Sequence, residues 1–569
     1  MTPHTLSPSR IARYFYHDCE RYLRYHATPR ALRAAGGVPH DRNRPSPFTA
    51  EILRRGYEWE ETVIGNYLNG SVRIASGEGP LHERAHGVRE TLALLKDLQP
   101  GAWLYQPTLE ASDAFLNRYG LDPARCRFPP CRPDLLRAVE DARGRRLQVI
   151  DIKASHGLKT SHRIQIALYG LLLRDALADA GSPLTVDLET GGIWLYERPE
   201  PEPVSLKPSL DAVERFLRDG LATILERPLE EVPWHLFFRC EWCEFFPHCH
   251  EEARAACSVS LLPYLSVGGR RFLRDAPWGG PAIDTLDDFA AFLEGPPAEV
   301  DAALEGCGSL RGRRAELRQA VTALKTEEVI AHGGSSPALP VNEHVKIVLT
   351  LHGDPHTGRL YALGVLRVKG QAVYGDPSSL KTWIAPSPED CSKAGAWLLD
   401  TLFEALETLH RYNEGLAWAD QKTLQAYVFD GYERTLLERL LVEALADADL
   451  APRALRLLFY FQNEQLAKQD EHPEPETPYP VVVLTQVIRR LLALPHPLAV
   501  RLPDVLAVLP APNFDYSLRP DDRYWFALSN TLKSDTVFEL WGGRDPTALE
   551  RLHEVGRQEW TPRNQVFLS

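Results

Sequence analysis

The sequence lacks three features that would each indicate a different class of protein. No stretch approaches the roughly 18 consecutive apolar residues of a membrane span, which argues against a transmembrane helix. The N-terminal segment has no apolar core of the kind found in signal peptides, so we expect a cytoplasmic protein. No G-x-x-x-x-G-K-[ST] pattern occurs, which argues against a P-loop ATPase in this chain.

An excess of basic residues is also missing, because the formal net charge is -13 at pH 7. This charge argues against a surface that binds polyanions everywhere, although acids elsewhere can hide a local basic groove in the sum. The composition, with 44% hydrophobic and 25% charged residues, is that of an ordinary globular protein. At 569 residues the chain is too long for one core, and we expect three domains.

Three regions of different character follow one another along the chain. Residues 1–257 mix helical and strand-like segments, and residues 258–340 are mostly helical. The loose stretch AHGGSSPALPVNEH then reads as a linker. Beyond it, VKIVLTLHGDPHTGRLYALGVLRVKGQAVYG contains apolar runs separated by turn signals, which predicts a strand meander, and helical segments follow to about residue 470. We therefore predict an α/β protein with domains at 1–257, 258–340 and 341–569.

The stretch CRPDLLRAVEDARGRRLQVIDIKAS predicts a β-hairpin that turns between Ala142 and Arg143. In this register Asp134 lies opposite Asp151, and directly opposed residues share one face with Cβ atoms about 5 Å apart. Lys153 shares that face with Asp151, because side chains along a strand repeat every two residues. The sequence can therefore bring two carboxylates and one ammonium group together at a strand edge.

Such a pair of carboxylates requires an explanation, because the two charges repel each other. A divalent cation relieves the repulsion, and aspartate oxygens suit Mg²⁺ or Mn²⁺. A lysine beside the metal can orient or help to deprotonate water. Upstream, the helical stretch FTAEILRRGYEWEETVIGNYL carries Glu60 near its middle, and Glu60 can complete the metal site. The alternative is a hairpin that carries ordinary surface charges.

The next helical stretch, SHRIQIALYGLLLRDALADAG, runs from a Ser161 cap to Gly181. Gln165 and Tyr169 are four residues apart, so they share one face of this helix. A polar pair that reaches phosphates fits the wall of a DNA groove. The alternative is a half-exposed glutamine beside a core tyrosine.

The set RPDLL, VIDIKAS and QIALY resembles the RecB-like branch of the PD-(D/E)xK nuclease superfamily. The resemblance implies a restriction-endonuclease-like core with a mixed sheet in residues 1–257. It also implies that Asp134 and Asp151 bind the metal and that Lys153 is catalytic.

By the same resemblance, Gln165 and Tyr169 would form the conserved helix motif of that family. Many relatives carry a histidine one residue before the upstream glutamate. This sequence has Trp59 at that position, which leaves Glu60 to act without it.

Nine cysteines in a reducing compartment indicate thiols or metal ligands rather than disulfides. The stretch RCEWCEFFPHC places Cys240, Cys243 and Cys249 in a C-x2-C-x5-C pattern, which suits Zn²⁺ or an iron–sulfur cluster. The fourth ligand could be Cys257, which is close in sequence, or Cys19, which is far upstream.

RecB-like nucleases with iron–sulfur clusters, among them the CRISPR-associated exonucleases and the nuclease domain of AddB-type helicase–nucleases, have one cysteine before the nuclease motifs and three after them. The resemblance implies a [4Fe–4S] cluster whose ligands are Cys19, Cys240, Cys243 and Cys249. It would close a long loop and constrain the unfolded chain. Zinc, or four buried thiols without a metal, are the alternatives.

The stretch SLLPYLSVGGRRFLRDAPWGGPAIDTLDDFAAFL resembles the helix-hairpin-helix segment of larger relatives, with Gly268 and Gly269 displaced from the usual positions; packing is the alternative role. From residue 341 the sequence resembles the RNase H-like domain of the same family. Thr350 and His352 stand where its first strand normally carries Asp-x-Glu, so we expect no metal catalysis there. That domain would serve as a scaffold, a DNA guide or a protein dock.

We expect a metal-dependent deoxyribonuclease that acts on single-stranded DNA ends or flaps in DNA repair or antiphage defence. Relatives are often fused to a superfamily 1 helicase, so a helicase partner would act in trans. The alternative is a non-catalytic DNA-binding or assembly subunit of a repair or defence complex, in which the nuclease fold is kept as a scaffold.

Overall fold

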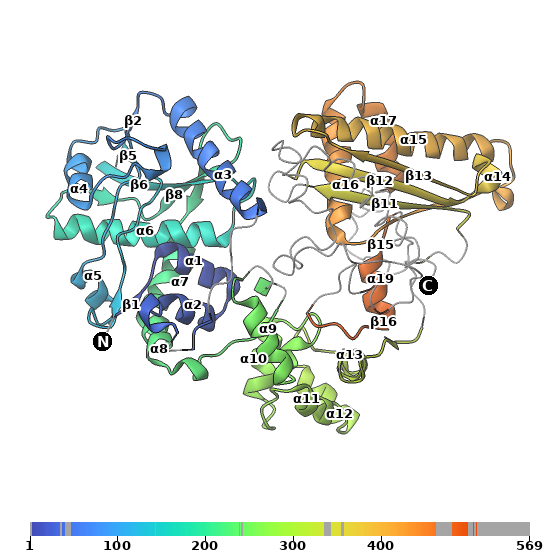
Figure 1. Cartoon of the computed structure of the whole chain (residues 1–569), viewed down its shortest axis with the longest axis horizontal. Helices are drawn as coiled ribbons and strands as arrows, with labels where there is room; N and C mark the ends of the chain where they lie inside the picture. The colour runs from blue at the N-terminus through green and yellow to red at the C-terminus, as the bar shows by residue number, and fades with distance from the viewer. Residues whose placement is uncertain are drawn as a thin grey trace. The chain divides into compact units, whose positions relative to one another are not determined.

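The computed structural model describes residues 3–34, 37–39, 47–142, 144–237, 239–240, 243–334, 339, 343–353, 358–461, 481–498, 505 and 508. The chain divides into two compact units. The first consists of residues 1–45, 49–235 and 243–248, and the second of residues 46–48, 236–242 and 249–569. Both units combine helices with a mixed sheet, which confirms the α/β class (Figure 1). No helix in the described ranges is long and apolar enough to cross a membrane.

A mixed sheet with strand order β2-β3-β5-β6-β8-β9, in which β7 also pairs with β6, forms the centre of the first unit. Its strands are β2 (Val72–Arg73), β3 (Trp103–Tyr105), β5 (Leu135–Asp141), β6 (Gly144–Lys153), β7 (Thr185–Val186), β8 (Thr190–Leu195) and β9 (Glu202–Ser205). β3, β5 and β6 are antiparallel, whereas β8 runs parallel to β6. A separate parallel pair joins β1 (His4–Thr5) to β4 (Cys126–Arg127).

Helices cover both faces of this sheet. They are α1 (Pro8–His17), α2 (Glu20–Ala27), α3 (Pro47–Thr62), α4 (Val88–Lys96), α5 (Asp113–Arg118), α6 (Thr160–Asp179), α7 (Lys207–Arg215) and α8 (Leu221–Glu226). Helix α6 packs on β6 and is itself covered by α1 (Figure 1). On the other face, α3 and the π-helical turn η2 (Val63–Tyr67) that continues it bury Trp59 and Val63 against Ile150 and Ile152.

The β5–β6 hairpin has the predicted register. Leu136 pairs with Val149, and Ala138 pairs with Leu147. The last pair joins Asp141 to Gly144, whose φ of 93° suits glycine because a Cβ would be strained there. Val149 lies in the core beneath α6, and alternation places the later odd-numbered side chains of β6 on the same face.

The start of α6 differs from the prediction. Ser161 was expected to cap this helix, but α6 begins at Thr160, and Lys159 is its N-cap without a side-chain hydrogen bond. Ser161 therefore lies within the first turn. A helix with a buried face does not require a polar cap, because packing supplies most of its stability.

The second unit contains a five-stranded sheet with the order β13-β12-β11-β14-β15. Its strands are β11 (Val345–Gly353), β12 (Leu360–Lys369), β13 (Ser378–Ile384), β14 (Leu424–Val428) and β15 (Val481–Val483). β11 and β12 form the strands of the predicted meander, but its last part, Gln371–Tyr374, is a short helix, and the third antiparallel strand, β13, follows the predicted stretch. β14 pairs parallel with both β11 and β15. Strand β14 interrupts a region for which only helices were predicted. A further short pair joins β10 (Ile330–Ala331) to β16 (Leu492–Ala493).

The other helices in the described ranges are α9 (Phe246–Ala255), α10 (Val267–Asp275), α11 (Leu286–Leu293), α12 (Pro297–Leu304), α13 (Arg314–Thr326), α14 (Gln371–Tyr374), α15 (Ala394–Asn413), α16 (Gly431–Glu443), α17 (Ala451–Phe461) and α19 (Leu484–Leu491). Helices α15, α16 and α17 share one core with the five-stranded sheet, and α19 packs in a second cluster with β14 and β15. The four helices α10 to α13 confirm the helical character predicted for residues 258–340.

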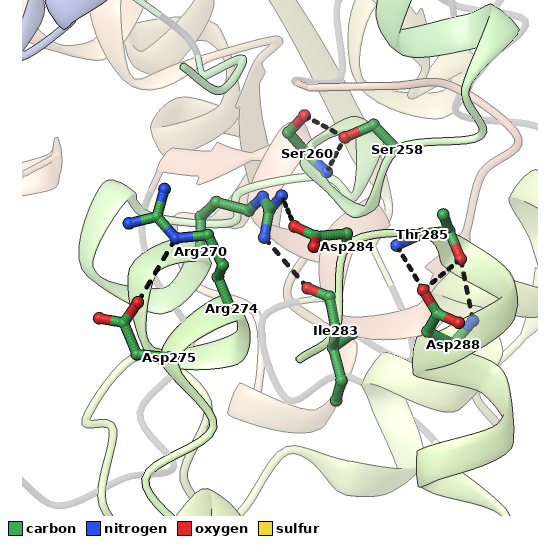
Figure 2. Close-up of polar contacts among 9 residues, drawn as sticks. All are labelled: Ser258, Ser260, Arg270, Arg274, Asp275, Ile283, Asp284, Thr285 and Asp288. Atoms are coloured by element: carbon green, nitrogen blue, oxygen red, sulfur yellow. Dashed lines mark hydrogen bonds and ion pairs between the residues drawn. The ribbon is translucent and has the colours of Figure 1, made fainter. Parts of the chain in front are cut away.

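Polar contacts fix the connection between α10 and α11, as Figure 2 shows. Arg270 donates to the Ile283 carbonyl at 3.0 Å and forms an ion pair with Asp284. Thr285 and Asp288 bond reciprocally in a capping box that starts α11. Gly269 lies inside the first turn of α10, where a Cβ would approach both Leu265 and Ser309 to 3.0 Å. This position therefore needs glycine for close packing.

Candidate active site

Strand β6 carries the acid and the lysine of the candidate site at its C-terminal end. The side chain of Asp151 is completely buried, whereas that of Lys153 is 25% exposed. Lys153 Nζ lies 2.6 Å from Asp151 Oδ2 and 3.9 Å from Asp134 Oδ2. Alternation along β6 accounts for this pairing, and the partial exposure of Lys153 leaves one side of the cluster open to solvent.

Asp134 reaches the cluster from the residue just before β5. Its Oδ2 accepts a hydrogen bond from the Ile152 amide at 2.7 Å, and its carbonyl accepts one from the Gln106 amide at 2.9 Å. These two bonds hold Asp134 beside β6 although the β5 ladder begins only at Leu135. The predicted proximity of Asp134, Asp151 and Lys153 is therefore present.

Glu60 joins the cluster from α3 on the opposite face of the sheet. It is buried, and its Oε1 accepts hydrogen bonds from Tyr105 Oη at 2.8 Å and from Gln106 Nε2 at 3.1 Å. Burial, followed by the negative charge of Asp134, raises the pKa of Glu60 to about 7. The charge of Lys153 acts in the opposite direction. Glu60 thus stands within electrostatic reach of Asp134 and Lys153.

The charges within the cluster oppose one another. Burial raises the pKa of Asp151 well above its ordinary value, and Lys153 only partly offsets this effect. Burial alone would lower the pKa of Lys153, but the carboxylates of Asp151 and Asp134 outweigh it and raise the pKa. The lysine therefore stays protonated at neutral pH, whereas the raised pKa values of Asp151 and Glu60 mean that these two carboxyls keep their protons to a higher pH than exposed carboxyls do.

Helix α6 turns the predicted polar pair toward these acids. Gln165 Nε2 donates to Tyr169 Oη at 3.3 Å, which confirms that the two residues share a face. Tyr169 is buried, and burial followed by the charges of Asp151 and Asp134 raises its pKa well above the ordinary value. Tyr169 therefore remains a hydrogen-bond donor beside the carboxylates.

Three residues of this site were not predicted from the sequence: Tyr105, Gln106 and His162. Tyr105 and Gln106 bind Glu60, and Gln106 has a φ of 43°, a strained conformation for a residue with a side chain. His162 is buried, and burial followed by the charges of Lys153 and Lys159 lowers its pKa to about 3. Its spacing of three residues from Gln165 places it on the same helix face and could have indicated it.

Trp59 belongs to the core and not to the cluster. Its ring is buried next to Tyr196 and Tyr67, and its Nε1 donates to the Trp194 carbonyl at 3.4 Å. An indole nitrogen only donates hydrogen bonds, so it cannot replace the metal-binding histidine of the resembling family. Trp59 therefore stabilises α3 by packing in the core, and Glu60 is the residue of this helix that contributes a carboxylate to the site.

The donor set suits a hard cation. Apart from the ion pair with Lys153, neither buried oxygen of Asp151 accepts a well-aligned hydrogen bond from a described residue. Carboxylate oxygens of Asp151, Asp134 and Glu60 are the ligands that Mg²⁺ or Mn²⁺ prefers. As the side chains stand, no group of three or more His, Cys, Asp or Glu residues in the described ranges is arranged to hold a metal ion. Lys153 instead supplies the positive charge between two of the carboxylates.

The four predicted cluster cysteines divide between the two units. Cys19 and Cys243 belong to the first unit, and Cys240 and Cys249 to the second. Cys19 is the N-cap of α2, and its Sγ accepts a hydrogen bond from the Tyr22 amide at 3.4 Å. Beside Cys243, Glu244 contacts His26 of α2 at 2.6 Å. The iron–sulfur cluster stays a prediction.

In the second unit, Thr350 and His352 are the residues that the sequence resemblance compared with the acids of an RNase H-like domain. Thr350 and His352 of β11 are buried. The nearby carboxylate of Glu433 accepts hydrogen bonds from the Phe429 amide at 2.8 Å and the Leu351 amide at 3.3 Å. Glu433 therefore connects α16 to β11 and to the residue that follows β14. The absence of metal catalysis in this unit stays a prediction.

No protein-family model matches the sequence, and no curated protein matches it.

The raised pKa of Glu60 predicts how the stability of the metal-free protein depends on pH. The folded state binds a proton on Glu60 up to about pH 7, whereas the unfolded chain releases it near 4.5. This stabilising contribution is present below the unfolded pKa and is lost as the pH rises through the folded pKa. Urea unfolding in EDTA should therefore show a free energy of unfolding that falls between about pH 5 and about pH 8.

The matched variant for this measurement is Glu60→Gln, which cannot titrate. Its free energy of unfolding should depend less on pH over the same range, with the rest of the curve unchanged. If the free energy of unfolding depends on pH equally in the two proteins, the pKa of Glu60 is not raised in the folded state.

Proposed function

We propose that the chain is a metal-dependent nuclease that hydrolyses phosphodiester bonds of single-stranded DNA. The observation that carries this proposal is the convergence of Glu60, Asp134, Asp151 and Lys153 at one edge of a mixed sheet. Hydrogen bonds from main-chain and side-chain donors hold two of the acids in place. Such preorganisation of costly charges is typical of catalytic sites.

In this proposal the side chains divide the work. Asp151, Asp134 and Glu60 would hold Mg²⁺ or Mn²⁺, which would polarise the phosphate and lower the pKa of a water molecule. Lys153 is kept protonated by the acids, so it would donate a hydrogen bond to the water or to a phosphate oxygen and offset developing charge. Tyr169 would remain a neutral donor that orients the acids, and Gln165, which is more exposed, would face the strand.

The test is cleavage of an end-labelled single-stranded oligonucleotide with Mn²⁺ or Mg²⁺, with EDTA as the metal-free control. We expect shortened products with either metal and none in EDTA. If the oligonucleotide stays intact with Mn²⁺ and with Mg²⁺ as it does in EDTA, the nuclease proposal is refuted. That result would favour a DNA-binding or assembly subunit.

The pathway remains part of the proposal. End processing in DNA repair or antiphage defence, with a superfamily 1 helicase in trans, would supply the single strands that this site needs. A [4Fe–4S] cluster with Cys19, Cys240, Cys243 and Cys249 as ligands, or zinc as the alternative metal, is also part of the proposal.

A further inference from the structure

Two parallel rings, one exposed and one partly buried, lie one helical turn away from Glu60. Tyr57 of α3 stacks on His82 of the 3-10 turn η3 (Leu81–Glu83), with ring centroids 3.7 Å apart and an interplanar angle of 12°. Tyr57 is 39% exposed, in contrast to Trp59 two residues later, which is buried. The ring pair therefore presents aromatic surface to solvent instead of filling the core.

Helix geometry places this ring pair beside the proposed catalytic centre. Tyr57 and Glu60 are three residues apart on α3, so their Cβ atoms lie about 5–6 Å apart on neighbouring positions of one helix face. Glu60 is buried and feels the charges of Asp134 and Lys153. If a nucleic acid strand binds with one phosphate at these acids, a neighbouring nucleotide of the strand would lie near the Tyr57–His82 pair.

The loop that carries His82 is held in position. Arg84 Nε and Nη2 donate to the Gly79 carbonyl at 3.0 and 2.7 Å and close the loop around η3. Leu81 packs against the aromatic core cluster that contains Trp59. A ring fixed before binding costs little ordering entropy when a ligand stacks on it.

The charges next to the rings indicate which part of a nucleic acid would contact them. Glu58 follows Tyr57 and forms an ion pair with Arg54, and Glu83, which is 67% exposed, follows His82 with its Oε1 4.0 Å from His82 Nε2. Because Arg54 offsets the charge of Glu58, the carboxylate of Glu83 is the group that disfavours a phosphate directly at His82. A nucleobase is uncharged, and each base has a flat face that stacks on an aromatic ring.

We propose that Tyr57 and His82 form a stacking subsite for one unpaired nucleobase, next to the phosphate that is cleaved. The subsite rests on the proposed function and specifies its substrate: a strand whose bases are free to leave the helical stack. Bases in a duplex present only their edges, so a double strand cannot use it. Stacking also tolerates any base, so cleavage would show little sequence preference.

The test measures binding separately from cleavage. A fluorescein-labelled single-stranded oligonucleotide that contains 2-aminopurine is titrated with protein in Ca²⁺, and a gel confirms that it stays intact. Wild-type protein should bind it and quench the 2-aminopurine fluorescence through stacking. Tyr57→Leu should bind about tenfold more weakly and lose the quenching, because stacking on one ring accounts for a difference of that size.

Two matched variants separate stacking from packing. Tyr57→Phe keeps the ring and should behave like wild type. Leu53→Ala changes an exposed apolar residue one turn earlier on α3, 49% exposed, and should also leave binding unchanged. Thermal unfolding of each variant shows whether the fold is retained.

The outcomes distinguish the two proposals. If Tyr57→Leu binds and quenches as wild type does, or if wild type does not bind the single strand, the stacking subsite is refuted. If binding depends on Tyr57 but no metal supports cleavage, the subsite stands and the nuclease proposal fails.

Discussion

Lys153→Ala is expected to lower the cleavage rate of single-stranded DNA with Mn²⁺ by about a thousandfold or more. The lysine is the cation in contact with Asp151, and in the proposed mechanism its charge would offset the negative charge that develops on the phosphate. Without it the transition state loses a preorganised donor, and Asp151 loses the counter-charge that partly offsets its burial. Single-turnover cleavage of a labelled oligonucleotide at saturating enzyme measures the chemical step directly.

The control for a general effect of losing a lysine is Lys96→Ala, at the exposed end of α4, which should cleave at the wild-type rate. Asp151→Asn should abolish cleavage as severely, because an amide is a poorer ligand for a hard cation than a carboxylate. Retention of cleavage within about tenfold of wild type in Lys153→Ala would remove this residue from the mechanism.

Cys19→Ser is expected to show whether Cys19 binds a metal or only caps helix α2. Serine accepts a backbone hydrogen bond at an N-cap at least as well as cysteine, so α2 should keep its cap. If Cys19 holds a [4Fe–4S] cluster, the variant purified without oxygen should lose the brown colour. Its thermal midpoint should fall by about 10 °C, because cluster binding contributes to folding.

The comparison variant is Cys257→Ser, at an exposed cysteine outside the proposed ligand set, which should keep both colour and stability. A colourless wild-type protein with one bound zinc would support the zinc alternative. A metal-free wild type with the same stability as Cys19→Ser would show that the four cysteines are ordinary thiols.

The hairpin register could be predicted because it depends on local chemistry. Alternating apolar residues fix which side chains share a face, and a turn centred on Ala142 and Arg143 fixes which residues oppose each other. The shared face of Asp151 and Lys153 follows from strand alternation, and the register brings Asp134 to the end of the ladder, where hydrogen bonds from the Ile152 and Gln106 amides hold it. The shared face of Gln165 and Tyr169 likewise follows from helical periodicity.

Residues that reach the site from irregular segments could not be predicted in the same way. Gln106 follows the three-residue strand β3 and has a positive φ, and no periodic pattern in the sequence predicts its place in the site. Tyr105 points to Glu60 only because α3 crosses the sheet at that level, which is a tertiary contact. Strand β14 was missed for a similar reason, since a five-residue buried run gives no period by which to distinguish strand from helix.

Helix α3 carries both the exposed ring of Tyr57 and the buried acid Glu60, and η2 anchors its end in the core. The separation between ring and acid is therefore set by the pitch of one rigid element and not by a loop. Each residue of an α-helix adds about 1.5 Å and about 100° of rotation, so a single deletion between the two would turn Tyr57 to another side of the helix. During evolution this segment would accept changes of exposed side chains but resist changes of length, whereas the surface loops of the same unit would tolerate both.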